Sequence, residues 1–257
     1  MSRVVITMAG LGSRFRARGY DMAKYRIQVA GRSLFAWSVG GLQAFIDAGW
    51  KFTFVSLRTD NAATFLEEEC ARLGIANYDH IELDQLTNGQ ATTALMALHA
   101  HEAQEPLVIF NIDTGVAPDA ITPEMIRGDG WLACFEAEGD GWSFADADAA
   151  GLVQRVTEKD RISDWCSIGF YAFKSQALFA HAYASTYQSD RLWPTREAYV
   201  APLYQTLIDE GREIRAAKVP NDAVFCLGTP EQVEDFAACQ GRAVTANVKP
   251  APERKRA

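Results

Sequence analysis

Short apolar runs alternate with amphipathic segments along the first half of the chain. Four runs rich in β-branched or aromatic residues predict buried strands: 4–7, 51–57, 80–83 and 106–112. Three segments with apolar residues near helical spacing predict helices between them: 31–49, 60–73 and 90–103. This alternation of strand and helix predicts a largely parallel sheet covered by helices.

The second half of the chain is less regular. Further strands are predicted at 131–136, 151–157, 168–173 and 213–219, and further helices at 175–184, 196–210 and 229–239. An acidic stretch, 140–148, separates the first two of these strands. Asp60 or Asn61 is predicted to cap one helix, which Gly74 ends. Thr229 is predicted to cap the last helix, with Pro230 at its first position.

Length and composition indicate one globular domain over residues 1–245, built from halves at about 1–115 and 116–245. The Pro-rich, charged tail, 246–257, is predicted to be disordered. The sequence has no secretory signal pattern and no apolar run long enough to span a bilayer, so we expect a cytoplasmic protein without membrane partners. The five cysteines are scattered without a CxxC pair, which predicts reduced thiols and no zinc site.

Charge separates one loop from the rest of the chain. With 25 Lys and Arg against 33 Asp and Glu, the net charge is −8, so we expect no nucleic-acid partner. The first predicted strand nevertheless leads into a glycine-containing loop with three arginines. Backbone N–H groups and guanidinium groups at such a strand end bind phosphate. The loop therefore predicts a binding site for a nucleoside triphosphate (NTP).

Two common phosphate motifs do not explain this loop. A Walker loop needs Gly-Lys-Ser/Thr, which is absent, and the third glycine of the dinucleotide fingerprint would fall at Phe15. Asp113 follows another predicted strand. Because ligands bind beyond the carboxyl ends of parallel strands, we expect Asp113 to lie near the loop. By itself an aspartate at this position could also be a simple turn former.

Residues 8–24 (MAGLGSRFRARGYDMAK) resemble the signature loop of nucleotidyltransferases of the sugar-phosphate pyrophosphorylase type. The loop matches at Gly10, Gly12, Arg14 and Lys24, whereas Ala23 stands where the family usually has proline. Five further segments match in the same order: 88–91 (NGQA), 111–113 (NID), 156–159 (VTEK), 168–173 (IGFYAF) and 227–231 (LGTPE). Taken singly, residues 88–91 could be only a helix cap, residues 111–113 only a turn, and residues 156–159 only an exposed charged hairpin.

The resemblance implies a Rossmann-like three-layer α/β/α fold of the GT-A type, with a mixed, mostly parallel sheet and a smaller acceptor-binding lobe. It implies catalytic roles for Arg14 and Lys24. The implied nucleotide-binding residues are Met8, Ala9, Gly10, Leu11, Gly12, Ser13, Arg14, Asn88, Gly89, Gln90 and Asn111. The resemblance implies that Glu158 and Lys159 face the acceptor, and Tyr171 and Arg191 are further candidates for binding it. The segment 187–194, which is rich in aromatic and basic residues, is predicted to be a lid or acceptor loop.

The implied cofactor is Mg²⁺, bound by Asp113. The family's second aspartate would fall at Cys226, so Asp222, six residues before Gly228, is the expected second ligand. The implied reaction transfers a nucleoside monophosphate, with CMP favoured, from an NTP such as CTP to a phosphorylated small molecule and releases pyrophosphate. The expected product is a precursor of bacterial capsule or other surface polysaccharide, and the expected assembly is a homodimer.

Three alternatives stay open. The chain could be a sugar-1-phosphate uridylyltransferase or thymidylyltransferase of the same family. It could be a GT-A glycosyltransferase that uses a nucleotide-sugar, although such enzymes bind metal through Asp-x-Asp and this chain has Asn-Ile-Asp at 111–113. It could also be a non-catalytic nucleotide-binding homologue, for which Cys226 is the hint.

Overall fold

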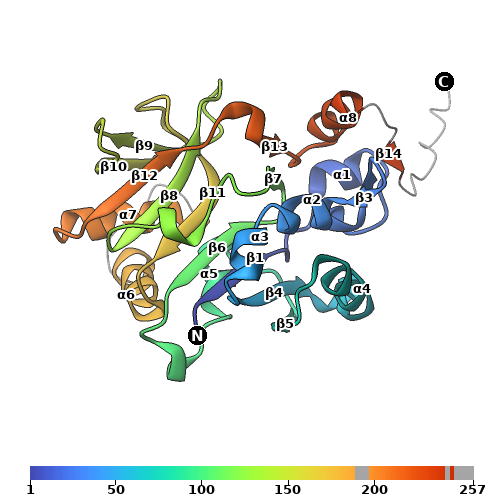
Figure 1. Ribbon diagram of the computed structural model, residues 1–257, viewed down its shortest axis with the longest axis horizontal. Helices are drawn as coiled ribbons and strands as arrows, with labels where there is room; N and C mark the ends of the chain where they lie inside the picture. Colours follow the sequence, from blue (N-terminus) through green and yellow to red (C-terminus); the bar gives the residue numbers. More distant parts are fainter. Residues whose placement is uncertain (189–196, 241–243, 246–257) are drawn as a thin grey trace, which may run out of the picture.

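The computed structural model describes residues 1–188, 197–240 and 244–245. Its centre is a mixed nine-stranded sheet flanked by helices (Figure 1). Four strands run parallel in the order β6-β1-β4-β5. Their bounds are β1 Arg3–Thr7, β4 Lys51–Leu57, β5 Tyr78–Leu83 and β6 Leu107–Asn111. All four coincide with the strands predicted from the apolar runs.

Five further strands extend the sheet beyond β6. Their bounds are β8 Gly130–Phe135, β9 Ser143–Ala147, β10 Val153–Glu158, β11 Cys166–Phe173 and β12 Ile214–Lys218. Strand β11 pairs antiparallel with β6, β8 and β9, whereas β12 runs parallel to β8. The sheet is therefore mixed, as predicted, and β11 joins its two halves.

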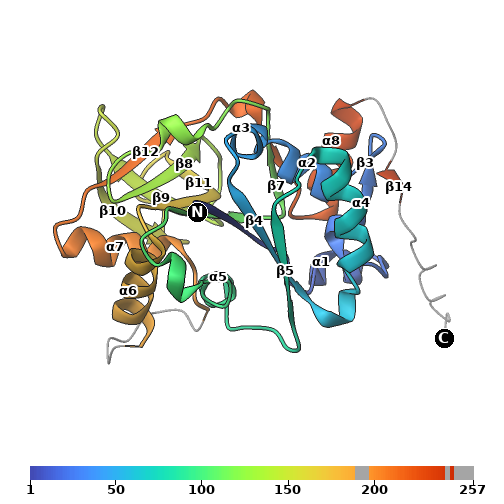
Figure 2. The same ribbon diagram turned by 60° about the horizontal axis from the view of Figure 1, so that its bottom comes forward.

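Helices cover both faces of the sheet (Figure 2). One face packs against α2 Leu34–Gly40, α3 Gln43–Asp47 and α4 Ala63–Leu73, and the other against α5 Gln90–Leu95, α6 Gln176–Tyr187 and α7 Ala201–Asp209. Strand β1 shows why both faces must be covered. Val4 and Ile6 enter the first apolar cluster and Val5 enters the second, because successive side chains point to opposite faces.

A smaller subdomain lies beside the parallel half of the sheet. It contains α1 Ser13–Ala17, α8 Pro230–Cys239 and the short strands β2 Gln28–Val29, β3 Arg32–Ser33 and β14 Val244–Thr245. A separate two-stranded ribbon pairs β7 (Thr114–Val116) with β13 (Val224–Cys226). A third apolar cluster, which includes Phe15 and Phe236, packs α1 against α8. The late part of the chain is thereby held next to the N-terminal loop.

Two predicted helices are divided or shortened by tertiary contacts in the structure. The helix predicted over 31–49 is divided into α2 and α3 at Gly41, whose added Cβ would lie 2.3 Å from the carbonyl oxygen of Val116 in β7. The helix predicted over 90–103 ends at Leu95. The chain then leaves the helix so that Glu102 can bind the buried Arg3 (Nη2–Oε2 2.7 Å). In both cases a tertiary contact overrides local helix propensity.

Two further details correct the sequence-based expectations. The acidic stretch contains strand β9, in which Phe144 and Ala145 are buried. Helix α4 begins after Ala62 without a side-chain cap, because 58–60 forms a 3₁₀ turn and Asn61 is left-handed. Gly74 ends α4 as predicted, and the Thr229 side chain caps α8 by accepting from the amide of Gln232. The predicted disordered tail, 246–257, lies outside the described residues. Within the described residues, every helix is too short or too polar to span a bilayer.

Candidate active site

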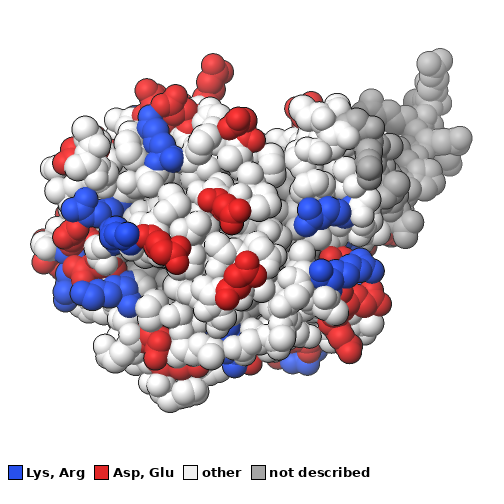
Figure 3. All heavy atoms as spheres, in the orientation of Figure 1, with Lys and Arg blue, Asp and Glu red and all other residues white. Residues whose placement is uncertain are grey.

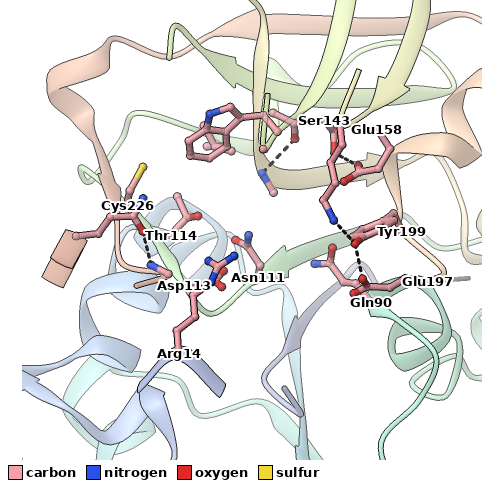
Figure 4. Close-up of a pocket in the computed structure, with 18 of the residues that line it drawn as sticks. Arg14, Gln90, Asn111, Asp113, Thr114, Ser143, Glu158, Glu197, Tyr199 and Cys226 are labelled. Carbon is pink, nitrogen blue, oxygen red and sulfur yellow. Dashed lines mark hydrogen bonds between the residues drawn. The ribbon is translucent and has the colours of Figure 1, made fainter. Parts of the chain in front are cut away.

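A cleft of about 820 Å³ opens at the carboxyl ends of β1 and β6, and a second cavity of about 580 Å³ adjoins it. Residues from both halves of the chain line the larger cleft (Figure 4). The two cavities share six lining residues: Lys24, Gln90, Asn111, Asp113, Glu197 and Tyr199. Four of these six are residues that the sequence analysis selected.

The loop from Gly10 to Arg14 forms one wall of the cleft. Gly12 has a left-handed backbone (φ 60°, ψ 38°), which glycine adopts without steric cost. An added Cβ at Gly10 would meet no atom within 4 Å, so a side chain there would occupy the adjoining cavity. The guanidinium of Arg16 donates to the carbonyl of Leu11 (2.9 Å) and fixes the loop.

The residues on either side of these glycines differ in accessibility. Met8 and Ala9 are buried beneath the loop, and of the two only Ala9 lines a cavity. Ser13 and Arg14 lie in the first turn of α1 and line the larger cavity. Within the described chain, the Arg14 side chain makes no hydrogen bond or ion pair. The cleft therefore contains a cation available to an anionic ligand.

Lys24 and Asp113 form an ion pair at the centre of the cleft. Lys24 Nζ lies 2.6 Å from Asp113 Oδ2. Although burial tends to raise the pKa of Asp113, the charge and hydrogen bond of Lys24 lower it below its ordinary value, with a smaller contribution from Arg14. Ala23, in place of the family's proline, has φ −60° and ψ 135°. Proline also adopts these angles, so the backbone before Lys24 has a conformation that the family's proline would fit.

Asn111 presents an unsatisfied oxygen next to this pair. Its Oδ1 is buried and has no hydrogen-bond partner within the described part of the chain. Gly169 makes room for the amide, because an added Cβ there would lie 2.2 Å from Asn111 Nδ2. Buried polar atoms are normally paired, so an orphaned oxygen indicates a place for a ligand. Carboxylate and amide oxygens suit Mg²⁺, whose remaining ligands are commonly phosphate oxygens and water.

The structure does not place Asp222 near Asp113. In the ribbon, Cys226 pairs with Thr114, and the amide of Leu227 donates to the Asp113 carbonyl (2.8 Å). Asp222 lies in a 3₁₀ turn, Asn221–Ala223, at the opposite end of the ribbon and outside both cavities. The expected second carboxylate is therefore replaced by the Cys226 thiol, whose pKa burial and Asp113 raise to about 11. Among the described residues, no three His, Cys, Asp or Glu side chains are grouped as a metal site.

The turn at 88–90 forms the opposite wall. Gln90 Nε2 donates to Thr7 Oγ1 at the end of β1 (3.1 Å), so the amide is fixed at the point where the two cavities meet. The side-chain oxygen of Asn88 instead accepts a hydrogen bond from the Thr92 hydroxyl. The backbone carbonyl of Asn88 accepts a hydrogen bond from the amide of Ala198 (2.8 Å). Gly89 is required here, since an added Cβ would lie 2.5 Å from the backbone of Ala198.

Glu158 and Lys159 close the far side of the larger cavity. Glu158 ends β10 and accepts a hydrogen bond from Ser143, and burial raises the pKa of its carboxyl group. The buried Tyr171 hydroxyl lies 3.4 Å from Ser143 Oγ, and burial raises its pKa as well. Lys159 has a left-handed backbone, φ 56°, which is strained for a residue with a side chain. Arg191 and most of the expected lid, 189–194, lie outside the described residues.

The sequence patterns did not single out Ser143, Glu197 or Tyr199, which are among the residues that line the cleft. Ser143 was hidden in the acidic stretch that forms β9. Glu197 and Tyr199 were assigned to a helix predicted over 196–210, whereas α7 begins at Ala201. Pro202 is the signal that could have located this start, because proline favours the first turn of a helix.

Charged side chains of both signs lie on the face of the molecule that Figure 3 shows. In the view of Figure 3, Lys and Arg side chains lie beside Asp and Glu side chains and do not gather into one large basic area. The cleft itself is lined by three cations, Arg14, Lys24 and Lys159, and by four carboxylates, Asp113, Glu138, Glu158 and Glu197.

Comparisons with solved structures find one relative at 33% identity and further structures that share the fold. The nucleoside-diphosphate-sugar pyrophosphorylase from Vibrio cholerae RC9 is 33% identical, with 91% of this chain and 99% of that chain covered and a TM-score of 0.83. The inositol-1-phosphate CTP transferase from T. maritima is 12% identical, with coverage of 94% and 96% and a TM-score of 0.72. The UTP-bound UGPase from Acinetobacter baumannii is 14% identical, with coverage of 94% and 93% and a TM-score of 0.69. No protein-family model and no curated protein matches the sequence.

Proposed function

We propose a reaction for this chain, which belongs to the sugar-phosphate nucleotidyltransferase family. In this reaction, the enzyme transfers the nucleoside monophosphate of an NTP to a phosphorylated small molecule and releases pyrophosphate. One observation carries the proposal. The glycine loop, the Lys24–Asp113 pair and the Glu158–Lys159 corner line a single cleft, although they are far apart in the sequence. That cleft offers adjoining spaces for a nucleotide and for an acceptor.

The proposed reaction is a displacement at phosphorus. An oxygen of the acceptor phosphate attacks the α-phosphorus of the NTP, the bond from the α-phosphorus to the bridging oxygen breaks, and pyrophosphate leaves. Lys24 would stabilise charge at the α-phosphate, Arg14 would neutralise the leaving pyrophosphate, and Lys159 would hold the acceptor phosphate. Such chemistry depends on positioning and charge neutralisation, so no covalent intermediate with the enzyme is needed.

The oxygen atoms around Asp113 fit a magnesium ion. Asp113, with the unpaired Oδ1 of Asn111 beside it, would hold the ion, and Mg²⁺ when bound supplies charge neutralisation on the phosphates. Lys24 competes for the same carboxylate, because it is paired with Asp113 at 2.6 Å. Release of Lys24 from Asp113 would free its ammonium group for the nucleotide.

For the substrates, we favour CTP and an acceptor that becomes a precursor of bacterial surface polysaccharide. This preference rests on the resemblance of the 8–24 loop and the 227–231 turn to short, single-domain enzymes of that kind. UTP or dTTP with a sugar 1-phosphate is the alternative. A glycosyltransferase reaction is disfavoured, since it leaves Arg14 and Lys24 without a triphosphate to bind.

A ligand screen followed by a product assay tests the proposal. We expect one of CTP, UTP, dTTP, ATP and GTP, with Mg²⁺, to raise the melting temperature well above the others, because a specific ligand stabilises the folded state. With that NTP, pyrophosphate release should require a phosphorylated acceptor. A nucleoside diphosphate released from a nucleotide-sugar would instead indicate a glycosyltransferase. Binding without any turnover would indicate a non-catalytic homologue.

A further inference from the structure

A three-residue segment, 197–199, connects the two sides of the cleft. Its backbone is tied to the nucleotide side, since the amide of Ala198 donates to the carbonyl of Asn88 (2.8 Å) and the amide of Ala91 donates to the carbonyl of Ala198 (2.9 Å). The absence of a side chain at Gly89 permits this close approach. The segment is therefore fixed relative to the 88–90 turn.

The side chains of the same segment point to the acceptor side. The hydroxyl of Tyr199 accepts a hydrogen bond from Lys159 Nζ and donates one to the carboxylate of Glu197 (Figure 4). The Lys159 ammonium also lies 4.5 Å from the centre of the Tyr199 ring. Tyr199 thus contacts Lys159 through both its hydroxyl and its ring.

An exposed lysine normally samples many rotamers, and fixing one costs conformational entropy. Lys159 is exposed, yet its backbone is held at φ 56° and its ammonium group is held by Tyr199. Two carboxylates, Glu158 and Glu197, lie close enough to interact with the same ammonium group. Tyr199 therefore holds one position of an ammonium group for which two carboxylates of the same cavity compete.

We propose that Tyr199 is a positioning residue, which holds the ammonium group of Lys159 toward the acceptor phosphate and fixes it relative to the nucleotide-binding turn. This inference rests on the proposed function for the identity of the acceptor. The contact itself can be tested without turnover.

The first test measures the position of Lys159 directly. Reductive methylation followed by mass spectrometry gives the reaction rate of each lysine. In Tyr199→Phe, we expect Lys159 to react several-fold faster than in the wild type, because loss of the hydrogen bond frees the amine and lowers its raised pKa. Tyr183→Phe is the matched control, since the Tyr183 hydroxyl bonds Thr92 (2.7 Å) outside both cavities. An unchanged Lys159 rate in Tyr199→Phe would overturn the proposal.

The second test is a double-mutant cycle on the acceptor reaction. Tyr199→Phe should raise the acceptor KM about tenfold, as expected for loss of a hydrogen bond to a charged group, and should raise the NTP KM less. The same change in a Lys159→Ala background should have no further effect, because Tyr199 acts through Lys159. Additive effects in the cycle would overturn the inference. A wild-type protein without turnover would instead refute the proposed function, and the methylation rates would still decide the position of Lys159.

Discussion

At the scale of single residues, the cleft combines cations that have different partners. Lys24 is neutralised by Asp113, Lys159 is bound by Tyr199, and Arg14 has no hydrogen-bonded partner in the described chain. An incoming triphosphate could therefore bind Arg14 without breaking an ion pair. To bind Lys24, it must displace the carboxylate of Asp113. The site is arranged for a ligand with several negative charges.

The two glycines of the loop should differ in what they contribute. Gly10→Val should leave the free energy of unfolding within about 0.5 kcal/mol of the wild type, because the added side chain meets open space. It should weaken NTP binding, because that space belongs to the cavity. Gly12→Ala should cost about 1 kcal/mol of stability, because its φ of 60° is strained for any other residue.

Urea unfolding and nucleotide titration by thermal shift separate these effects. Gly12→Ala serves as the control for a general loss of stability in the loop. An unchanged melting shift with NTP in Gly10→Val would show that the phosphates do not approach this part of the backbone.

A site residue could be located from the sequence where it directly follows a predicted strand. It could not be located where its position depends on the register in which two short strands pair. Asp113 could be located because it follows an apolar run directly. The position of Asp222 depends on the pairing of β13 with β7, which brings Cys226 to the cleft. No local pattern encodes that pairing, because short strands gain their stability from tertiary contacts.

At the scale of elements, the parallel strands could be predicted because both of their faces are buried. The helix over 31–49 could not be divided correctly, since its break at Gly41 comes from the approach of Val116, more than seventy positions away. The segment 197–199 was missed for a similar reason. Its backbone is held by hydrogen bonds between Ala198 and the distant turn at 88–91, which its own sequence does not indicate.

The contact between these two segments should be sensitive to Gly89. In Gly89→Ala, the added Cβ would lie 2.5 Å from the Ala198 backbone, so the 197–199 segment must move. We expect the KM values of both NTP and acceptor to rise, because the segment borders both cavities. Steady-state kinetics with each substrate varied in turn would measure this change.

Gly74→Ala is the matched control for Gly89→Ala. Gly74 also has positive φ, 74°, but an added Cβ there would meet no atom within 4 Å, and it lies at the end of α4, outside both cavities. This variant should lose about 1 kcal/mol of stability and keep normal KM values. Normal KM values in Gly89→Ala would contradict the role of the contact.

At the scale of the whole molecule, a buried ionic cluster ties the sheet to its connections, well away from the cleft. Arg3 is 1% exposed and lies at the start of β1. It donates to Glu102 (2.7 Å) and Asp79 (2.9 Å), and Lys51 also pairs with Asp79 (2.9 Å). The cluster thus connects β1, β4, β5 and the segment before β6.

Arg3→Met should destabilise the fold by about 3 kcal/mol, since it leaves the Glu102 carboxylate, which is only 12% exposed, without its charged partner. Lys51→Met is the matched control, because Lys51 is partly exposed and should cost less than about 1 kcal/mol. Urea denaturation at pH 7 would measure both. Equal effects of the two variants would contradict a special role for the buried guanidinium.

The same cluster should make stability depend on pH. Burial tends to raise the pKa values of Asp79 and Glu102, but hydrogen bonds, from Arg3 above all, lower both below their ordinary values. Carboxylates with lowered pKa in the folded state stabilise it above their unfolded pKa, and the stabilisation is lost as pH falls through the folded pKa. We therefore expect the free energy of unfolding to fall below about pH 4, with a smaller decrease in Arg3→Met. A parallel decrease in both proteins would contradict this assignment.

The central claim is that the cleft around Lys24 and Asp113 catalyses nucleotidyl transfer. Its most direct test is acceptor-dependent pyrophosphate release by Lys24→Ala, with Lys174→Ala as a control that removes an exposed lysine outside both cavities. We expect Lys174→Ala to turn over normally and Lys24→Ala to lose about 10²-fold or more in kcat, as for loss of a charge contact made in the transition state. Near-normal turnover in Lys24→Ala would contradict the account.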